Sequence, residues 1–255
     1  MRLIRLSACH SYVILEKGKN RKLNRDIPYH IEIIDKCNIF LDYEDRMKHP
    51  FVRRCFFLNG NARPVIIKQK LRGKGENKMD TSLFHELEGE YIYFKPLSTS
   101  DAQEIHSYAS DKNVKRYIGW PLMKTLDETR NYIVEMLRRE SAGTHLYASI
   151  VLKSTKIIIG TAMIFNFDHE AKHAEIGYVF DSRYWGKGYG TETVALMNGF
   201  AFDSLNLHKL HARVVGANIG SIRVLEKNGF MLEGRLKDYH FIDNSYSDGM
   251  IFGKY

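Results

Sequence analysis

The chain of 255 residues contains little cysteine, and none after position 55. Cys9, Cys37 and Cys55 stand at spacings that match no zinc-binding or disulfide framework. No apolar run approaches the ~20 residues that a membrane-spanning helix requires. Polar residues interrupt the stretch over 1–15, which argues against the apolar core of a signal peptide. These absences predict a cytoplasmic protein without a membrane partner or a bound metal.

Acidic residues are scarce in the first 78 residues, which hold 18 Lys/Arg against 8 Asp/Glu. Residues 79–255 hold 20 and 22, so the formal net charge of +8 comes from the first part alone. That basic segment has neither a recognised nucleic-acid-binding module nor aromatic residues interleaved with its charges. We therefore do not expect a nucleic-acid partner, and binding through residues 1–78 is kept only as an alternative.

No sustained helical or strand period runs through residues 1–78, so no fold is assigned to them. Three interpretations of this segment stay open. It is a basic accessory segment, a small extra subdomain, or upstream sequence that is not part of the natural protein. In the third interpretation, translation of the natural protein would start at Met79.

A regular pattern begins at Tyr91 and continues to the end of the chain. Strands are expected where apolar runs lie between turn residues, and helices where apolar residues recur at helical spacing. In chain order these are a strand over 91–96, helices over 98–109 and 125–139, strands over 146–152, 157–165 and 174–180, a helix around 194–205, a strand over 209–215, a helix over 218–228, and strands over 231–242 and 246–252. The order predicts one mixed α/β domain over 91–255.

One turn between a predicted strand and a predicted helix is rich in glycine, and it reads Trp185-Gly186-Lys187-Gly188-Tyr189-Gly190. Glycines let successive backbone amides converge without obstruction by Cβ atoms, and the start of a helix adds a partial positive charge. Such a turn suits a pyrophosphate, and Lys187 adds a full charge nearby. The spacing matches neither a P-loop nor the dinucleotide fingerprint.

These residues resemble the GNAT superfamily, whose pyrophosphate loop has the form Q/R-x-x-G-x-G/A. The frame falls on Trp185, Gly188 and Gly190, with Trp185 in place of Gln or Arg. A tryptophan there is similar to the RimJ/RimL-type branch, which acetylates ribosomal proteins. A second family block covers Asn218-Ile219-Gly220-Ser221, then 226–230 and Glu233-Gly234. The resemblance implies a GNAT fold, a single catalytic domain with a splayed central mixed β-sheet flanked by helices.

The same resemblance implies that acetyl-CoA is the co-substrate and that a primary amine attacks its thioester directly. The acceptor is expected to be a protein N-terminal amine, with a small amine such as a polyamine or an aminated antibiotic as the alternative. A CoA-binding protein without activity is a further alternative, and the protein is expected to be a monomer or a homodimer. The residues expected to contact CoA are Tyr178, Val179 and Phe180 through their backbones, Trp185 and the turn from Gly186 to Gly190, and Asn218 and Ser221.

Three side chains are candidates for proton transfer. Ser221 is the candidate acid, because Leu225 occupies the position where many superfamily members carry a tyrosine. Its alternative role is to satisfy backbone amides in the first turn of a helix. Glu175 is the favoured base, since partial burial would raise its pKa, and its alternative role is in a structural salt bridge. His240 is the rival base, because histidine titrates in the right range.

The acceptor site is expected between the two early helices, where Tyr117-Ile118-Gly119-Trp120-Pro121 lies. Tyr117 and Trp120 would grip a peptide end or the stem of a polyamine. The alternative is that both aromatic side chains are anchors of the hydrophobic core.

Overall fold

The computed structural model describes residues 2–5, 12–16, 30–32, 51–56, 65–70 and 81–255. The chain divides into two compact units, Met1–Lys48 and His49–Tyr255. In the first unit β1 (Arg2–Arg5), β2 (Tyr12–Glu16) and β3 (His30–Glu32) form an antiparallel sheet. Most of the segment over 1–78, including Cys9 and Cys37, lies outside the described residues. So does Met79, the expected translation start in the third interpretation.

The second unit begins with an antiparallel hairpin of β4 (Phe51–Phe56) and β5 (Val65–Lys70) and contains a mixed sheet of seven strands. The strands of that sheet are β6 (Ile92–Lys95), β7 (His145–Leu152), β8 (Ile158–Asp168), β9 (His173–Phe180), β10 (Lys209–Val215), β11 (Met231–Ile242) and β12 (Ser245–Lys254). Their order is β11-β12-β10-β9-β8-β7-β6. All neighbours are antiparallel except β9 and β10, which are parallel. The mixed α/β sheet is the predicted fold class.

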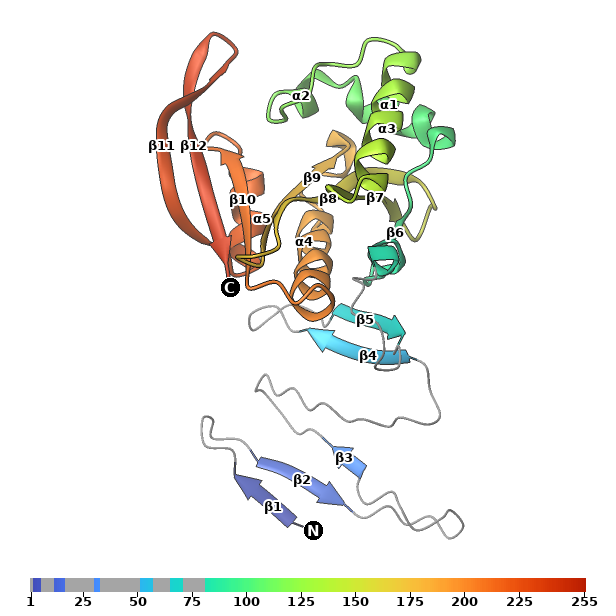
Figure 1. The fold of residues 1–255 in the computed structure, drawn as a ribbon, viewed down its shortest axis with the longest axis vertical. Helices are drawn as coiled ribbons and strands as arrows, with labels where there is room; N and C mark the ends of the chain where they lie inside the picture. The colour runs from blue at the N-terminus through green and yellow to red at the C-terminus, as the bar shows by residue number, and fades with distance from the viewer. Residues whose placement is uncertain (1, 6–11, 17–29, 33–50, 57–64, 71–80) are drawn as a thin grey trace. The chain divides into compact units, whose positions relative to one another are not determined.

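Helices cover both faces of this sheet (Figure 1). They are α1 (Ala102–Ala109), α2 (Lys112–Lys115), α3 (Leu126–Ser141), α4 (Tyr189–Gly199) and α5 (Ile219–Lys227), with short helical turns η1 (Thr81–Glu86), η2 (Thr99–Asp101), η3 (Ser182–Tyr184) and η4 (Phe200–Ser204). Alternate strand residues point to opposite faces, so Val151 packs with α1 and α3 whereas Ile150 packs with α4 and α5. Phe84 and Leu87 belong to the hydrophobic core on the α4 and α5 side of the sheet, so residues before Tyr91 contribute to that core.

Local chemistry explains where several elements begin and end. Thr125 and Glu128 form a capping box that starts α3, and Gly229 takes a φ of +79° just after α5. Asp243 and Asn244 both have positive φ, as a tight hairpin turn between β11 and β12 requires. Among the described residues, no helix is long and apolar enough to cross a membrane.

The sheet splays apart in its middle. Strands β9 and β10 pair only at His173, Ala174 and Glu175, opposite Lys209, Leu210 and His211. Beyond these pairs the two strands diverge, while β9 stays paired with β8 as far as Phe180. The splay therefore leaves one edge of β9 without a strand partner, as the expected fold requires.

Candidate active site

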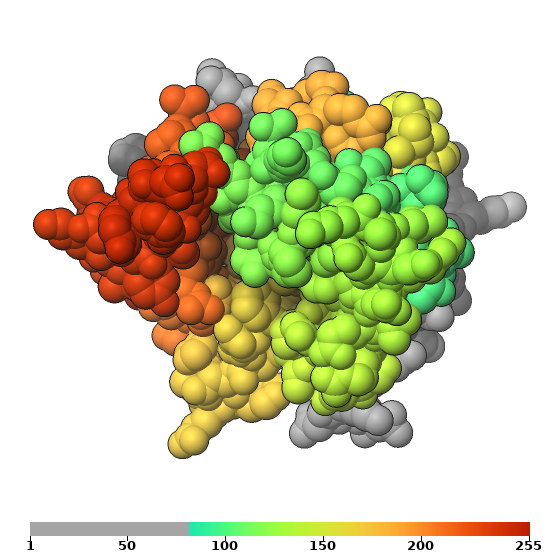
Figure 2. Space-filling view, turned by 90° about the horizontal axis from the view of Figure 1, so that it is seen from above, coloured from blue at the N-terminus to red at the C-terminus, as the bar shows by residue number. Residues whose placement is uncertain are grey.

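A cavity of about 750 Å³ opens where β9 and β10 separate. Its walls come from the segment after α1, from β8, β9 and β10, from the glycine-rich turn and from the start of α5. Figure 2 shows the β11–β12 hairpin in red and the segment around α2 in green on either side of this region. An exposed ion pair of 2.8 Å joins these two sides, from Arg116 Nε to Asp243 Oδ2.

The backbone of β9 presents hydrogen-bonding groups to the gap. The N–H of Asp181 donates to the carbonyl of Ile159 at 2.9 Å, so the groups of Val179, two residues earlier, also face β8. Tyr178 and Phe180 therefore turn their backbone groups toward the gap. The indole Nε1 of Trp185 already donates to the Phe180 carbonyl at 2.9 Å. All three predicted backbone partners of CoA line the cavity, but the backbone groups of Val179 face β8, so those directed to the gap belong to Tyr178 and to the Phe180 N–H.

Glycine suits the three positions of the turn for different structural reasons. Gly186 and Gly188 have φ of +72° and +89°, and a Cβ atom on either would point into open space. Gly190 lies in α4 against Val224 of α5, where an added Cβ would approach a methyl carbon to 3.2 Å. The backbone shape of the turn thus depends on Gly186 and Gly188, whereas Gly190 allows the two helices to pack closely.

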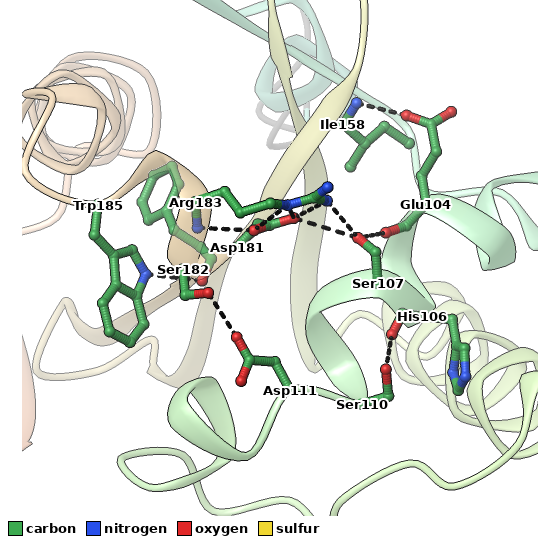
Figure 3. A network of polar contacts seen from close by, with 11 residues as sticks. Glu104, His106, Ser107, Ser110, Asp111, Ile158, Asp181, Ser182, Arg183 and Trp185 are labelled. Atoms are coloured by element: carbon green, nitrogen blue, oxygen red, sulfur yellow. Dashed lines mark hydrogen bonds and ion pairs between the residues drawn. The ribbon is translucent and has the colours of Figure 1, made fainter.

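Polar contacts tie the segment just before this turn, the end of β9 and η3, to α1 and to the start of α2 (Figure 3). The buried Asp181 carboxylate accepts hydrogen bonds from the Arg183 guanidinium and from the Ser107 hydroxyl of α1. The Ser182 hydroxyl donates to Asp111, which caps α2, at 2.6 Å. The guanidinium and the hydrogen bonds outweigh the effect of burial and lower the pKa of Asp181, so this carboxylate stays ionised.

A pair of hydroxyl groups lies at the start of α5. Asn218 caps the helix by accepting a hydrogen bond from the Ser221 N–H at 3.1 Å. The Ser221 hydroxyl instead lies 2.8 Å from the hydroxyl of Tyr178, which reaches it from β9. Burial raises the pKa of Tyr178 to about 12, so its hydroxyl is protonated at neutral pH.

Glu175 is buried at the closed end of the gap and is held by three side chains. The guanidinium of Arg213 forms two bonds of 3.0 Å with its oxygens, and Asn166 donates to it at 2.9 Å. The third neighbour, His211, lies 3.6 Å away. Burial alone would raise the pKa of Glu175, but the polar contacts with His211, Arg213 and Asn166 outweigh it and hold that pKa at about 2. The expected upward shift is therefore wrong in direction.

Other predicted side chains lie in different places. His240 pairs with Ser247 on the β11–β12 hairpin and is not among the residues that line the cavity. Tyr117 does line the cavity. Trp120 does not, and its ring packs edge-on against Tyr132 at 5.1 Å between centroids, as in its alternative role of core anchor.

Residues 92–231 match the family described as the acetyltransferase (GNAT) domain. The chain belongs to the GNAT family. It is 33% identical over 171 residues to the probable N-acetyltransferase YjcK of Bacillus subtilis, an alignment that covers 65% of this chain and 94% of that protein. It is 26% identical over 161 residues to the spermidine N(1)-acetyltransferase of Escherichia coli K12, covering 62% of this chain and 83% of the relative.

A solved structure also resembles this N-acetyltransferase. It is the ribosomal-protein-S5-alanine acetyltransferase of Vibrio fischeri, with a TM-score of 0.58, 25% identity, and coverage of 66% of this chain and 94% of that one. GNAT acetyltransferases use acetyl-CoA as the donor and acetylate an amine. Coenzyme A or acetyl-CoA is present in other solved structures that resemble the chain.

The cavity of the acetyltransferase has the charge that acetyl-CoA requires. Among the described residues that line it, Glu175 supplies the only carboxylate, whereas four carry positive charge, namely Lys187, Arg213, Arg223 and Lys227. Cations near a helix start attract phosphate groups. The open space over Gly186 and Gly188 leaves room for a pyrophosphate beside their backbone amides. The residues present therefore fit this co-substrate.

Proposed function

We propose that this acetyltransferase transfers the acetyl group of acetyl-CoA to the N-terminal amine of a protein. The observation that supports this acceptor is the lack of a base in the cavity. Among its described lining residues there is no histidine, and the only carboxylate, Glu175, has a pKa of about 2. Such a carboxylate cannot accept a proton from an ammonium group, so the acceptor amine must arrive neutral.

An α-amine meets that requirement better than a polyamine does. With a pKa of ~7.7–8.0, about a tenth of an α-amine is neutral at pH 7. An alkylamine with a pKa of ~10.4 is neutral in fewer than about one molecule in a thousand. The similarity to a ribosomal-protein acetyltransferase supports the same class of acceptor.

In the proposed complex the pantetheine arm lies along the open edge of β9 and bonds with Tyr178 and the Phe180 N–H. The pyrophosphate lies on the backbone amides from Gly186 to Gly190, with Lys187 beside it. Asn218 keeps the start of α5 in place through its cap to Ser221. Arg213 donates two hydrogen bonds to Glu175, which keep its guanidinium in place. Its three other guanidinium N–H donors are left for the acceptor end of the cavity.

The proposed chemistry is direct attack. The acceptor nitrogen forms a bond with the acetyl carbon, the C–S bond breaks with its electron pair on sulfur, and Ser221 supplies the proton to the leaving thiolate. We assign Glu175 to holding Arg213 rather than to proton abstraction. His240 receives no proton-transfer role, because it lies outside the cavity lining.

The test is acetyl-CoA turnover, measured as free thiol, on matched acceptors. The panel contains a short peptide with a free N-terminus, the same peptide blocked at its N-terminus but carrying one lysine, and spermidine. We expect thiol release with the first acceptor, and kcat/KM that rises with pH as that amine deprotonates. Faster turnover of spermidine or of the blocked peptide would contradict the proposed acceptor. Tight acetyl-CoA binding with no thiol release from any amine would contradict an active enzyme.

A further inference from the structure

We infer that Tyr178 is a positioning residue for Ser221, whose hydroxyl it orients toward the leaving sulfur by donating a hydrogen bond to it. This inference rests on the proposed role of Ser221 as the acid. In many superfamily members a tyrosine stands at the position that Leu225 occupies here, and Leu225 is fully buried in the core. That comparison therefore gives no indication of a function for the side chain of Tyr178.

The first support is that the Ser221 hydroxyl is not engaged in capping. A serine in the first helical turn often satisfies backbone amides. Here Asn218 Oδ1 already accepts from the Ser221 N–H at 3.1 Å. The partner of Ser221 Oγ is the Tyr178 hydroxyl at 2.8 Å. The serine hydroxyl is therefore available for chemistry in the cavity that both residues line.

The second support is the hydrogen-bonding capacity of the Tyr178 hydroxyl, which favours Tyr178 as the donor. The acceptors within reach of the Tyr178 hydroxyl, Ser221 Oγ at 2.8 Å and the Ser221 carbonyl at 3.4 Å, belong to the same residue. A phenol is a better donor than an aliphatic alcohol. When Tyr178 donates, the proton of Ser221 is left free to point into the cavity. Since the pKa of Tyr178 is about 12, the donor keeps its proton throughout the neutral range.

The third support is that the two hydroxyl groups come from separate elements. Tyr178 belongs to β9, the strand whose open edge faces the gap, and Ser221 belongs to α5. The same strand residue would thus hold the pantetheine with its backbone and the acid with its side chain. Correct placement of the co-substrate and correct orientation of the acid then depend on one rigid strand.

The transfer step balances without another reactant. The C–N bond forms, the C–S bond breaks, and the electron pair of the latter stays on sulfur. As sulfur takes the Ser221 proton, the serine oxygen takes the proton that the acceptor nitrogen releases on amide formation, so no full alkoxide forms beside the more acidic phenol of Tyr178. The hydrogen bond from Tyr178 stabilises the partial charge on the serine oxygen during this exchange, and Tyr178 keeps its own proton.

The experiment is a double-mutant cycle with Tyr178→Phe, Ser221→Ala and the double variant, using whichever amine the wild type acetylates. We expect Tyr178→Phe to lower kcat roughly tenfold, as for the loss of one hydrogen bond, with KM for acetyl-CoA within about twofold. Ser221→Ala should lower kcat by about a hundredfold. The double variant should match Ser221→Ala alone, because Tyr178 acts only through Ser221.

Tyr93→Phe is the matched control, because Tyr93 lies on β6 and is not part of the described cavity lining. Thermal unfolding of each variant checks that the fold is intact. Additive losses in the double variant, or wild-type kcat in Tyr178→Phe, would overturn the inference and leave the proposed function standing. A peptide that is not acetylated while spermidine is would overturn the proposed acceptor and leave the cycle measurable. Absence of turnover with every amine would contradict both.

Discussion

Glu175 shows how a single residue changes its role once its neighbours are known. The sequence places it on the strand beside the glycine-rich turn, which favours a base. Its partners Asn166 and Arg213 come from the two adjacent strands, β8 and β10. The parallel register that brings β10 beside it cannot be deduced from residue periodicity alone. The result is a carboxylate that is buried, ionised and paired.

This pairing predicts an acid-sensitive contribution to stability. The folded pKa of Glu175 is about 2, below the unfolded value of ~4.3, so its contribution is present above pH ~4.3 and is lost as pH falls through 2. A shift of this size corresponds to about 3 kcal/mol. Glu175→Gln should remove most of that dependence, as measured by denaturant unfolding between pH 2 and pH 6.

Glu135 is the matched control for that measurement. Hydrogen bonds from Arg138 and Arg139 also lower its pKa to about 2, but it lies on the exposed face of α3. Solvent screening leaves such pairs with little net energy. Glu135→Gln should therefore leave the acid dependence close to that of the wild type. Equal losses in the two variants would show that burial of Glu175 does not strengthen its ion pair.

Trp185 makes a second prediction at this scale. Trp185→Phe keeps an aromatic ring but removes the donor to the Phe180 carbonyl. Without this donor, the Phe180 carbonyl at the open edge of β9 is held less firmly, and this is the edge with which the pantetheine is expected to bond. KM for acetyl-CoA should therefore rise about threefold to tenfold, in line with one lost hydrogen bond. Trp120→Phe, which lies outside the cavity lining, should leave that KM unchanged. An unchanged KM in Trp185→Phe would contradict the role of the indole.

At the scale of elements, the glycine-rich turn allows a test with a closely matched control. Gly188 and Gly143 both have positive φ, +89° and +72°, and open space where a Cβ would lie. Replacement by alanine should cost each about 1–2 kcal/mol of stability, since the left-handed conformation disfavours a Cβ. Only Gly188→Ala should also weaken acetyl-CoA binding, as measured by titration calorimetry. Equal affinity in the two variants would argue against a pyrophosphate site at the turn.

The elements with strong periodic patterns were predicted well. The strand over 209–215 has the expected bounds, and the helix over 125–139 begins at the capping box of Thr125. The single turn of α2 was missed, because four residues cannot display a helical period. Local motifs likewise indicated the glycine-rich turn and the helix that starts at Asn218. The Tyr178–Ser221 and Glu175–Arg213 contacts join separate elements, so no local pattern could reveal them.

At the scale of the whole molecule, we propose that residues 79–255 carry the complete catalytic machinery. The residues that line the cavity lie between Val114 and Lys227, and the described core includes residues from Phe84 onward. A chain that starts at Met79 should keep kcat and KM for acetyl-CoA within about twofold, because no described residue before Val114 lines the cavity. A large loss of turnover would show that the first 78 residues support the site.

The splay of the sheet has a mechanical consequence. Strands β6 to β9 and strands β10 to β12 form the two halves of the sheet, and their direct strand pairing is confined to one end, at His173 to Glu175. The two halves can therefore move relative to each other about that end. A co-substrate bound along the open edge of β9 would act as an additional strand and restrict this motion. Hydrogen exchange at the amides of Tyr178 and Phe180 should slow sharply when acetyl-CoA binds, whereas the Val179 amide, already paired with β8, should respond less.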